Sequence, residues 1–428
     1  MCGYVTFKYP IFVDIIVREE FMRKRFLVIG LILLFICMSI TQSSAFDNVK
    51  KSTIPIFNGN TLYVGGNGPD NYTRIQDAID NASDGDTVFV FDDSSPYHEN
   101  IVINKSIFLI GEDKNNVVLD GDLKDNVITI TDDDVFVSGF TMIHPCYPSD
   151  IWDSTLVDIV SSENVTIKDN FIRQYEWEFP TNNACVVLRN SSYCFIQNNT
   201  IISDETSRAF GVVLLPDSKF NNISGNEISL FISGVEIQWC SENVIYMNYL
   251  HHNLDGVDIW YGNNNTIINN IINFNSGEGI SFEDSSNNQI IGNTITDNGE
   301  GEWIDNGIYI GLGSNNYISY NHISRNNPNG ILILSIKNYI TYNDFSNNPV
   351  GVYCEGYHNH ITKNNFMNNK RNAYLKVGLL DLRNFWDENY WNRPRFFPYP
   401  VFGLMIGIFN EFLWVNFDWH PAQEPYDI

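Results

Sequence analysis

The sequence predicts an all-β fold, a right-handed parallel β-helix, from three observations. An asparagine followed two residues later by a large apolar residue recurs nine times, at intervals of 21 to 29 residues. Apolar and polar residues alternate over short runs rich in β-branched side chains, which is the period of a strand. A repeat near 22 residues built from strands is typical of a solenoid, whose neighbouring coils bury one continuous core.

Each repeat has the same internal order. A strand beginning with glycine comes first, a polar turn and an apolar strand follow, and the strand after the asparagine closes the coil, as in residues 256–272 and 279–295. No helical stripe interrupts the coils, so the crossover helices of a βαβ fold have no sequence from which to form. We therefore expect three short parallel strands in each coil.

The repeated asparagines form one column of the predicted solenoid. They are Asn170, Asn199, Asn226, Asn248, Asn270, Asn293, Asn321, Asn343 and Asn364. The apolar residues that should stack inside the coils are Ile172, Ile201, Ile228, Leu250, Ile272, Ile295, Ile323, Phe345 and Phe366. Asparagine tolerates the left-handed α conformation, and its amide can bond along stacked turns. We interpret the column as scaffold and not as a binding ladder.

We divide the chain into five segments. They are an upstream extension with a signal peptide (1–45), a linker (46–61), an N-terminal cap with the first coils (62–142), the β-helix repeats (143–371) and a C-terminal cap (372–428).

Residues 22–45 have the order of a signal peptide. Three basic residues follow Met22, an apolar run covers residues 26–40, and small residues lead to a cleavage site after Ala45. The apolar run is shorter than the ~20 residues of a membrane-spanning helix, so we expect a secreted or cell-surface protein with no membrane span in the mature chain. A retained anchor, and a start at Met1 or at Met22, stay open.

Both ends of a solenoid must be covered. Apolar residues between Thr73 and Ala82 lie on one helical face, and Thr73 and Gln76 have the spacing of a capping box. Residues 396–417 are strongly apolar, but two prolines, an asparagine and a glutamate interrupt them. We expect an N-terminal capping helix and a C-terminal cap of short strands.

The chain is strongly acidic. Its formal net charge is -26, which argues against binding nucleic acid because phosphate contacts need clustered Lys and Arg. Asn-x-Ser/Thr sequons are glycosylation sites on exported proteins, so we expect a glycoprotein. The sequons begin at Asn71, Asn81, Asn104, Asn164, Asn190, Asn198, Asn222 and Asn264.

Five cysteines follow the cleavage site, namely Cys146, Cys185, Cys194, Cys240 and Cys354. They lack the close pairing of a zinc site, and most lie in or beside apolar strand runs, where cysteine acts as a small buried apolar residue. Cys185 and Cys194 are also placed to bridge one coil, which an oxidising compartment permits. Both interpretations stay open.

Two stretches resemble a known family. Residues 75–88 contain Ile-Gln, Ala-Ile and Gly-Asp-Thr-Val, and are similar to the N-terminal cap and first coil of the pectate-lyase-like superfamily. Residues 384–386 (Asn-Phe-Trp) and 389–391 (Asn-Tyr-Trp) resemble the motif with which NosD-like solenoids finish. The resemblance covers residues 62–428. It implies the carbohydrate-binding or sugar-hydrolase type of this fold, in an archaeal or bacterial surface protein.

Acidic and aromatic side chains gather on the outward side of the glycine strands in the central coils. Alignment of the coils places Glu236, Asp258 and Tyr309 in one column, and Gln238, Trp260 and Glu283 in the next. The same alignment turns Val186 and Leu188 outward. Neighbouring coils lie ~4.8 Å apart, so the acidic and aromatic side chains should form one patch.

Longer coils raise loops at one edge of this patch. They bring there Tyr147, Trp152, Tyr175, Trp177, Phe179, Glu302, Trp303 and Asp305. A groove with carboxylates on its floor and aromatic loops as its walls suits an extended polysaccharide. We expect Trp303 to bind sugar together with the two columns.

We expect non-catalytic binding of a polysaccharide or cell-surface glycan. A hydrolase or lyase of the same fold is one alternative, because Glu236 and Asp258 on adjacent coils approach the separation of retaining glycosidases. A structural surface-layer or adhesion component is another. The Gly-His-Gly of polygalacturonases and the Asp-Pro-His of mannuronan epimerases are absent. The sequence leaves enzymatic activity and oligomeric state open.

The resemblance to NosD also implies copper delivery. The dense histidines are His251, His252, His358 and His360. Copper sites need several converging soft ligands, whereas His251 and His252 follow a buried residue at a turn, where solvated histidines are common. We expect no cofactor, with Ca²⁺ bound by Glu236, Asp258 and Glu283 as the alternative.

Overall fold

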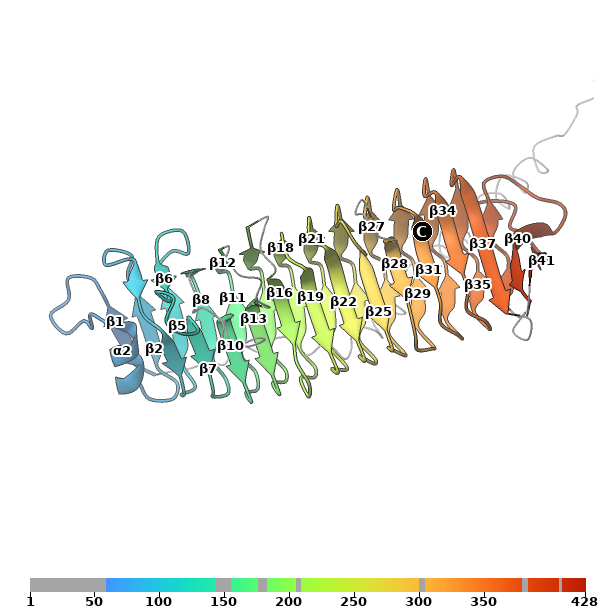
Figure 1. Cartoon of the computed structure of the whole chain (residues 1–428). Helices are drawn as coiled ribbons and strands as arrows, with labels where there is room; N and C mark the ends of the chain where they lie inside the picture. The colour runs from blue at the N-terminus through green and yellow to red at the C-terminus, as the bar shows by residue number, and fades with distance from the viewer. Residues whose placement is uncertain are drawn as a thin grey trace, which may run out of the picture. The chain divides into compact units, whose positions relative to one another are not determined.

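The computed structural model describes residues 59–143, 155–175, 183–204, 209–299, 305–378, 384–407 and 410–428. The chain divides into two units, Met1–Lys51 and Ser52–Ile428, and every described residue belongs to the second. This unit is a right-handed solenoid of parallel strands with about 13 turns (Figure 1), which confirms the predicted fold class. The predicted signal peptide and Cys146 fall outside the described residues.

Most coils contribute one short strand to each of three parallel stacks, here called sheets, and the pairing of β40 (Tyr399–Ile406) with β41 (Glu411–Asp418) joins two of these into one 28-stranded sheet. The glycine sheet contains β4 (Ile101–Ile103), β7 (Ile128–Ile130), β10 (Thr155–Val160), β13 (Ala184–Arg189), β16 (Phe210–Leu214), β19 (Ser233–Gln238), β22 (Asp255–Trp260), β25 (Ile280–Glu283), β28 (Asn306–Ile310), β31 (Asn329–Ile333), β34 (Val350–Cys354), β37 (Arg371–Gly378) and β40 (Tyr399–Ile406). The middle sheet contains β1 (Thr61–Val64), β2 (Thr87–Val90), β5 (Phe108–Gly111), β8 (Phe136–Ser138), β11 (Thr166–Lys168), β14 (Phe195–Gln197), β17 (Asn222–Ser224), β20 (Val244–Tyr246), β23 (Thr266–Ile268), β26 (Gln289–Ile291), β29 (Tyr317–Ser319), β32 (Tyr339–Thr341), β35 (His360–Thr362) and β38 (Phe385–Asp387). The asparagine sheet contains β3 (Tyr97–His98), β6 (Val118–Asp120), β9 (Thr141–Ile143), β12 (Phe171–Arg173), β15 (Thr200–Ile202), β18 (Glu227–Ser229), β21 (Tyr249–His251), β24 (Ile271–Asn273), β27 (Thr294–Thr296), β30 (His322–Ser324), β33 (Asp344–Ser346), β36 (Asn365–Met367) and β39 (Tyr390–Trp391).

The predicted core column is confirmed. The strand register pairs Leu250 with Ile272 and Ile272 with Ile295, and all nine predicted members of the column are fully buried. The column continues beyond Phe366, whose ring stacks on Trp391 with 4.5 Å between the ring centroids. Each fully buried side chain of this size contributes about 1.5–3 kcal/mol, so the stack is a main source of stability.

The asparagine column is structural, as predicted. The backbone N–H and the side-chain Nδ2 of Asn248 both donate to Oδ1 of Asn270, at 2.8 and 3.0 Å. Asn270 repeats both bonds to Asn293. The expected backbone conformation is wrong by one residue, because the left-handed residue precedes the asparagine, as Asn269 (φ 54) does before Asn270. The residue with positive φ therefore turns the chain, and the asparagine after it bonds the turn to the next coil through its buried amide.

Two further asparagine ladders lie at the other corners of the coils. Asn265 and Asn275 flank Asn270 at a spacing of five residues, and the backbone N–H of each donates to the matching asparagine, Asn288 or Asn298, of the next coil. The spacing of five is visible in the sequence. However, the repeated pattern of an asparagine followed two residues later by a large apolar residue includes only the middle asparagine of each three. The three ladders satisfy buried backbone groups where the sheets end.

The glycines that begin the glycine strands are required by the closeness of the coils. A Cβ atom on Gly256 would lie 2.5 Å from the carbonyl oxygen of Gly279 and 2.6 Å from Cγ2 of Ile272. Gly279 has the same relation to Gly307 in the next coil. Any side chain at these positions would push neighbouring coils apart.

The N-terminal helix is present but is not capped as predicted. α2 spans Ile75–Asn81 and packs its apolar side against β1, β2 and β4. The predicted capping box of Thr73 and Gln76 is wrong, since no side chain at the N-cap bonds the helix. The carboxylate of Glu99 instead accepts the backbone N–H groups of Ile75 and Gln76, at 2.8 and 3.0 Å. A residue of the next coil therefore satisfies the free amides of the first turn.

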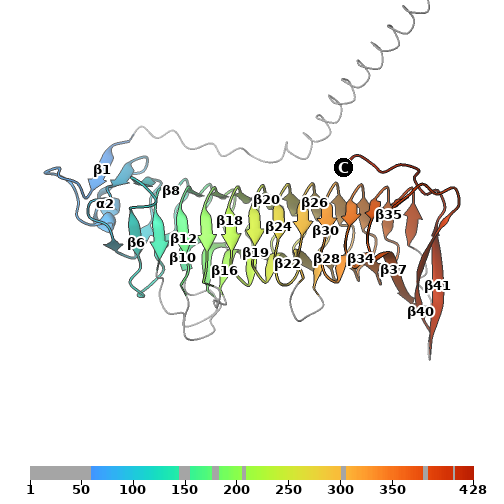
Figure 2. The same cartoon turned by 90° about the horizontal axis from the view of Figure 1, so that it is seen from above.

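The C-terminal end is a strand hairpin. β40 continues the glycine sheet beside β37, and β41 (Glu411–Asp418) pairs with it in antiparallel orientation (Figure 2). Oδ2 of Asp418 accepts the N–H and Nδ2 of Asn389 and Nε1 of Trp391, so Asp418 ends the asparagine ladder. Within the described residues, no helix is long and apolar enough to cross a membrane.

The described cysteines are free thiols. Cys185, Cys194, Cys240 and Cys354 are all buried, which confirms their interpretation as small apolar residues. The alternative disulfide between Cys185 and Cys194 is wrong. Burial raises the pKa of Cys194 to about 12, so its thiol stays protonated.

Among the sequons, Asn222 is buried in β17, so the folded chain does not offer this amide for glycosylation.

Candidate functional site

The predicted patch lies on the outward face of the glycine sheet. Glu236 pairs with Asp258, and Gln238 with Trp260, on the adjacent strands β19 and β22. The columns continue on β25 and β28, where Trp260 pairs with Glu283 and Ser281 pairs with Tyr309. The structure therefore aligns the predicted side chains of the central coils as expected.

The predicted register is wrong in one strand. In β13, Val187 pairs with the outward Asp158, whereas Val186 and Leu188 are buried in the core. Arg189 follows on the outward side, and its Nε donates to Oδ1 of Asp158 at 2.8 Å. A shift by one residue moves every side chain of a strand to the other face, and the unbroken apolar run of β13 contains no alternation that would set the register.

Glu236 and Asp258 form the centre of the patch. Both side chains are buried. Nε2 of Gln238 donates to Oε1 of Glu236 at 3.0 Å, and Nε1 of Trp260 donates to Oδ2 of Asp258 at 2.6 Å. Each carboxyl group is thus oriented by the side chain two residues later on its own strand.

Burial sets the protonation of this pair. Burial, and then the charge of Asp258, raises the pKa of Glu236 to about 8. Burial also raises the pKa of Asp258, to about 6, although hydrogen bonds with Trp260 and Ser281 act in the opposite direction. At neutral pH Glu236 therefore holds a proton while Asp258 is mostly ionised. Such a pair can donate one hydrogen bond and accept another, or transfer a proton.

A second row of acids lies where the glycine strands begin. Asp255 and Glu278 stand directly before Gly256 and Gly279, and Oδ1 of Asp255 accepts the N–H of Glu278 at 2.8 Å. Burial raises the pKa of Asp255 well above its ordinary value and that of Glu278 to about 7. In the sequence, an acidic residue directly before the glycine is the signal that could identify these two residues. The predicted columns do not include them, because the alternation of outward and inward side chains ends before these corners.

Asp305 lies beside this row, two residues before Gly307, and its charge acts on Glu278. The sequence places it in a loop at the edge of the patch, and the structure shows it buried just before β28. Burial raises its pKa. Six carboxyl groups on adjacent coils thus surround one surface: Glu236, Asp255, Asp258, Glu278, Glu283 and Asp305.

Tyr309 closes the patch beside Glu283. Burial, and then the charge of Glu283, raises the pKa of Tyr309 to about 12. A Cβ atom on Gly311 would lie 2.9 Å from the hydroxyl of Tyr309 and would collide with the carboxylate of Glu283. The glycine at this position leaves room for both polar groups.

Exposed rings lie beside the carboxyl groups. Trp260, the predicted platform, is 42% exposed. Trp239 and Tyr261, which the columns do not include, are also exposed and stack with centroids 5.1 Å apart and planes 5° apart. Both occupy corners with positive φ, where strand alternation has ended. Three rings at the ends of β19 and β22 therefore present apolar surface to solvent.

The predicted loop walls fall largely outside the described residues. Six of their side chains are in this position: Tyr147, Trp152, Trp177, Phe179, Glu302 and Trp303. Tyr175 is described, and the guanidinium of Arg173 lies 4.6 Å from the centre of its ring.

The histidines that the sequence brings close together can be placed in the described part of the chain. Nδ1 of His251 lies 2.8 Å from Nδ1 of His252, and Nε2 of His251 lies 3.4 Å from Glu227. Copper needs several converging soft ligands, and among the described residues the one group of three metal-ligating side chains whose atoms converge within 4.8 Å is His98, Asp120 and Asp122. Those are one nitrogen and two carboxylates, and Lys124 lies 2.6 Å from Asp122.

Two family models match the chain, and one of them describes the observed fold. Residues 233–396 match the family described as periplasmic copper-binding protein (NosD), and residues 155–306 match the right handed beta helix region. The chain is similar in structure to the A-module of Azotobacter vinelandii mannuronan C-5 epimerase AlgE4, with 15% identity and a TM-score of 0.49, over 72% of this chain and 99% of that chain. It is also similar to DFA-IIIase from Arthrobacter chlorophenolicus A6 without its lid, with 12% identity and a TM-score of 0.49, over 78% and 94% of the two chains. No functionally curated protein matches.

Proposed function

We propose that this chain, a NosD-like right-handed parallel β-helix repeat protein, binds an extended polysaccharide on the outward face of its glycine sheet. The observation that supports this proposal is the buried pair of Glu236 and Asp258 beside the exposed ring of Trp260. A sugar has hydroxyl groups at its edge and C–H groups on its faces, so paired carboxyl groups beside an indole match both. Neighbouring strands lie ~4.8 Å apart, so consecutive sugar units can lie across consecutive coils.

We place the protein outside the cytoplasm. The matched family is described as periplasmic, and an acidic chain suits a solvated surface. Secretion by a signal peptide and glycosylation belong to the same proposal. Ca²⁺ stays an alternative ligand of the carboxylates, so binding should be measured with and without a chelator.

A glycan array with the full chain tests the proposal. Trp260→Ala should weaken binding to any glycan that the wild type binds by about two- to tenfold, because the stacked ring supplies about 0.5–1.5 kcal/mol beyond the hydrogen bonds. Tyr317→Ala is the matched control, since Tyr317 is a ring of similar exposure (47%) on the middle sheet. Equal binding by Trp260→Ala and wild type, or no glycan bound by the wild type, would contradict the proposal.

A polysaccharide hydrolase or lyase is the second candidate. The specific observation in its favour is that Glu236 holds a proton at neutral pH next to an ionised Asp258, as a general acid and its partner require. Product analysis on a bound glycan separates the two functions. If wild type releases product and Glu236→Gln binds without releasing any, the protein is an enzyme. If the wild type releases none, it is a binding protein, and Glu242→Gln, an exposed control, should behave like wild type in either case.

A further inference from the structure

The C-terminal hairpin is apolar on both faces. Residues directly opposite each other in an antiparallel pair share a face. One face carries Met405 and Trp414, which pack against the core of the last coil. The other face, which alternation directs away from the core, carries the opposite pairs Phe402 with Val415 and Leu404 with Leu413. Only the first of these faces is needed to close the solenoid.

The second face is open to solvent. Leu413 is 72% exposed, and Phe402 is exposed beside it. Phe396, which is 88% exposed, precedes the hairpin, and the exposed Trp419 follows it. Soluble proteins rarely leave a continuous apolar surface of this kind uncovered unless it binds something.

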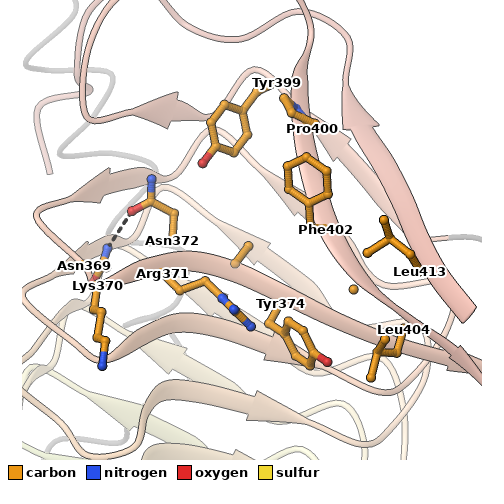
Figure 3. Close-up of a pocket in the computed structure, with 12 residues that line it drawn as sticks. Asn369, Lys370, Arg371, Asn372, Tyr374, Tyr399, Pro400, Phe402, Leu404 and Leu413 are labelled. Atoms are coloured by element: carbon orange, nitrogen blue, oxygen red, sulfur yellow. Dashed lines mark hydrogen bonds between the residues drawn. The ribbon is translucent and has the colours of Figure 1, made fainter. Parts of the chain in front are cut away.

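Two cations lie next to this face. A hollow of about 450 Å³ is lined by Lys370 and Arg371 on one side and by Phe402 and Leu413 on the other (Figure 3). The guanidinium of Arg371 rests 4.7 Å from the centre of the Tyr374 ring. The neighbouring lysines of the last coils pair with glutamates, whereas within the described residues no carboxylate lies in ion-pair distance of Lys370 or Arg371.

These cations stand out on an acidic protein. The chain has 25 Lys and Arg against 51 Asp and Glu, so two adjacent cations contrast with its overall charge. Arg393 and Arg395 lie just before the exposed Phe396 and add two more positive charges to this end. Apolar surface and positive charge therefore meet beside β40, while the exposed Glu411 lies at the start of β41.

We propose that the C-terminal hairpin docks onto an anionic lipid surface. Phe402 and Leu413 would enter the boundary of the hydrocarbon, while Lys370 and Arg371 bind the negatively charged headgroups. Aromatic side chains such as Trp419 suit the membrane interface, where one side of the ring is apolar and the other is wet. An anionic amphiphile thus matches both halves of the surface.

Other occupants match it less well. A second copy packed face to face would bring Lys370 and Arg371 against the same two cations of the other copy, at a cost in local charge repulsion. A polysaccharide has hydroxyl groups where Leu404 and Leu413 present hydrocarbon. Charge complementarity therefore favours lipid.

Hydroxyl-radical footprinting of the full chain tests this proposal residue by residue. The oxidation of Phe402, Leu413 and Trp419 should fall several-fold when vesicles of phosphatidylcholine with phosphatidylglycerol are added. Leu312 and Tyr317, which are exposed on other coils, should be oxidised equally with and without vesicles. Because the readout is at the hairpin itself, attachment through another part of the chain would not produce this result. Unchanged oxidation of the hairpin overturns the proposal.

Variants separate the remaining outcomes. The double variant Phe402→Ser with Leu413→Ser should lose the protection of Trp419, whereas Leu312→Ser should keep it. Lys370→Gln with Arg371→Gln should weaken the protection by anionic vesicles, whereas Lys219→Gln, an exposed cation on another coil, should not. Equal protection by vesicles of phosphatidylcholine alone overturns the role of the cations. Protection that rises with protein concentration in the absence of vesicles would instead identify a second copy as the occupant.

Discussion

The fold raises the pKa of Glu236 far above the value that an exposed glutamate would have. Its pKa rises from an ordinary 4.5 to about 8, first because burial disfavours the charged form and then because Asp258 adds a like charge. The folded state therefore holds a proton that the unfolded state releases. The stability associated with this group is fully present below pH 4.5 and is lost as pH rises through about 8.

Glu236→Gln should remove this loss. Glutamine keeps the shape of the side chain and cannot ionise, so the variant should match wild type below pH 4.5 and have a higher Tm above pH 8. The gain in unfolding free energy is at most about 5 kcal/mol, since one pKa unit is worth ~1.4 kcal/mol. Thermal melts followed by circular dichroism across this pH range measure it, with the exposed Glu242→Gln as control. A difference that does not change with pH would contradict the proposed protonation.

At the scale of the element, the glycine strands depend on having no side chain at their first position. Gly256→Ala should lower Tm, because its Cβ would lie 2.5 Å from the carbonyl oxygen of Gly279. Overpacking of this kind costs about 1–3 kcal/mol. Gly378→Ala is the matched control, since a Cβ there meets nothing within 4 Å. Similar melting of the two variants would show that the coils can separate at little cost.

The strands also show what can be predicted from a single sequence. Where polar and apolar residues alternate, as in β19 and β22, the sequence places Glu236, Asp258 and Trp260 correctly. Where a strand is apolar throughout, as in β13, the pattern contains no information on register. Corner residues such as Trp239 follow no alternation, so their stacking on the next coil is visible only in three dimensions.

At the scale of the whole molecule, the repeat predicts the solenoid because each coil contacts only its neighbours. The two ends of the solenoid cannot be predicted in this way, because the repeat stops there. The helix α2 is capped by Glu99 from the following coil, and the ladder ends at Asp418, which lies 29 residues beyond Asn389. The exposed face of the hairpin could not be predicted either, because apolar residues in a sequence indicate burial.

The N-terminal end supports a prediction about the entire chain. Deletion of residues 62–86 removes α2 and most of β1, and so uncovers the backbone edge of β2 and the apolar residues that α2 contacts. An open parallel edge above an uncovered core is a template for pairing with other chains, so the truncated protein should aggregate and not fold as a shorter solenoid. Ile79→Asp, which places a charge in the buried face of α2, should have the same effect in the complete chain, whereas the exposed Asp80→Asn should remain soluble. Size-exclusion chromatography with light scattering measures the outcome. A monomeric truncated protein with an intact strand spectrum would show that the first coils close without the helix.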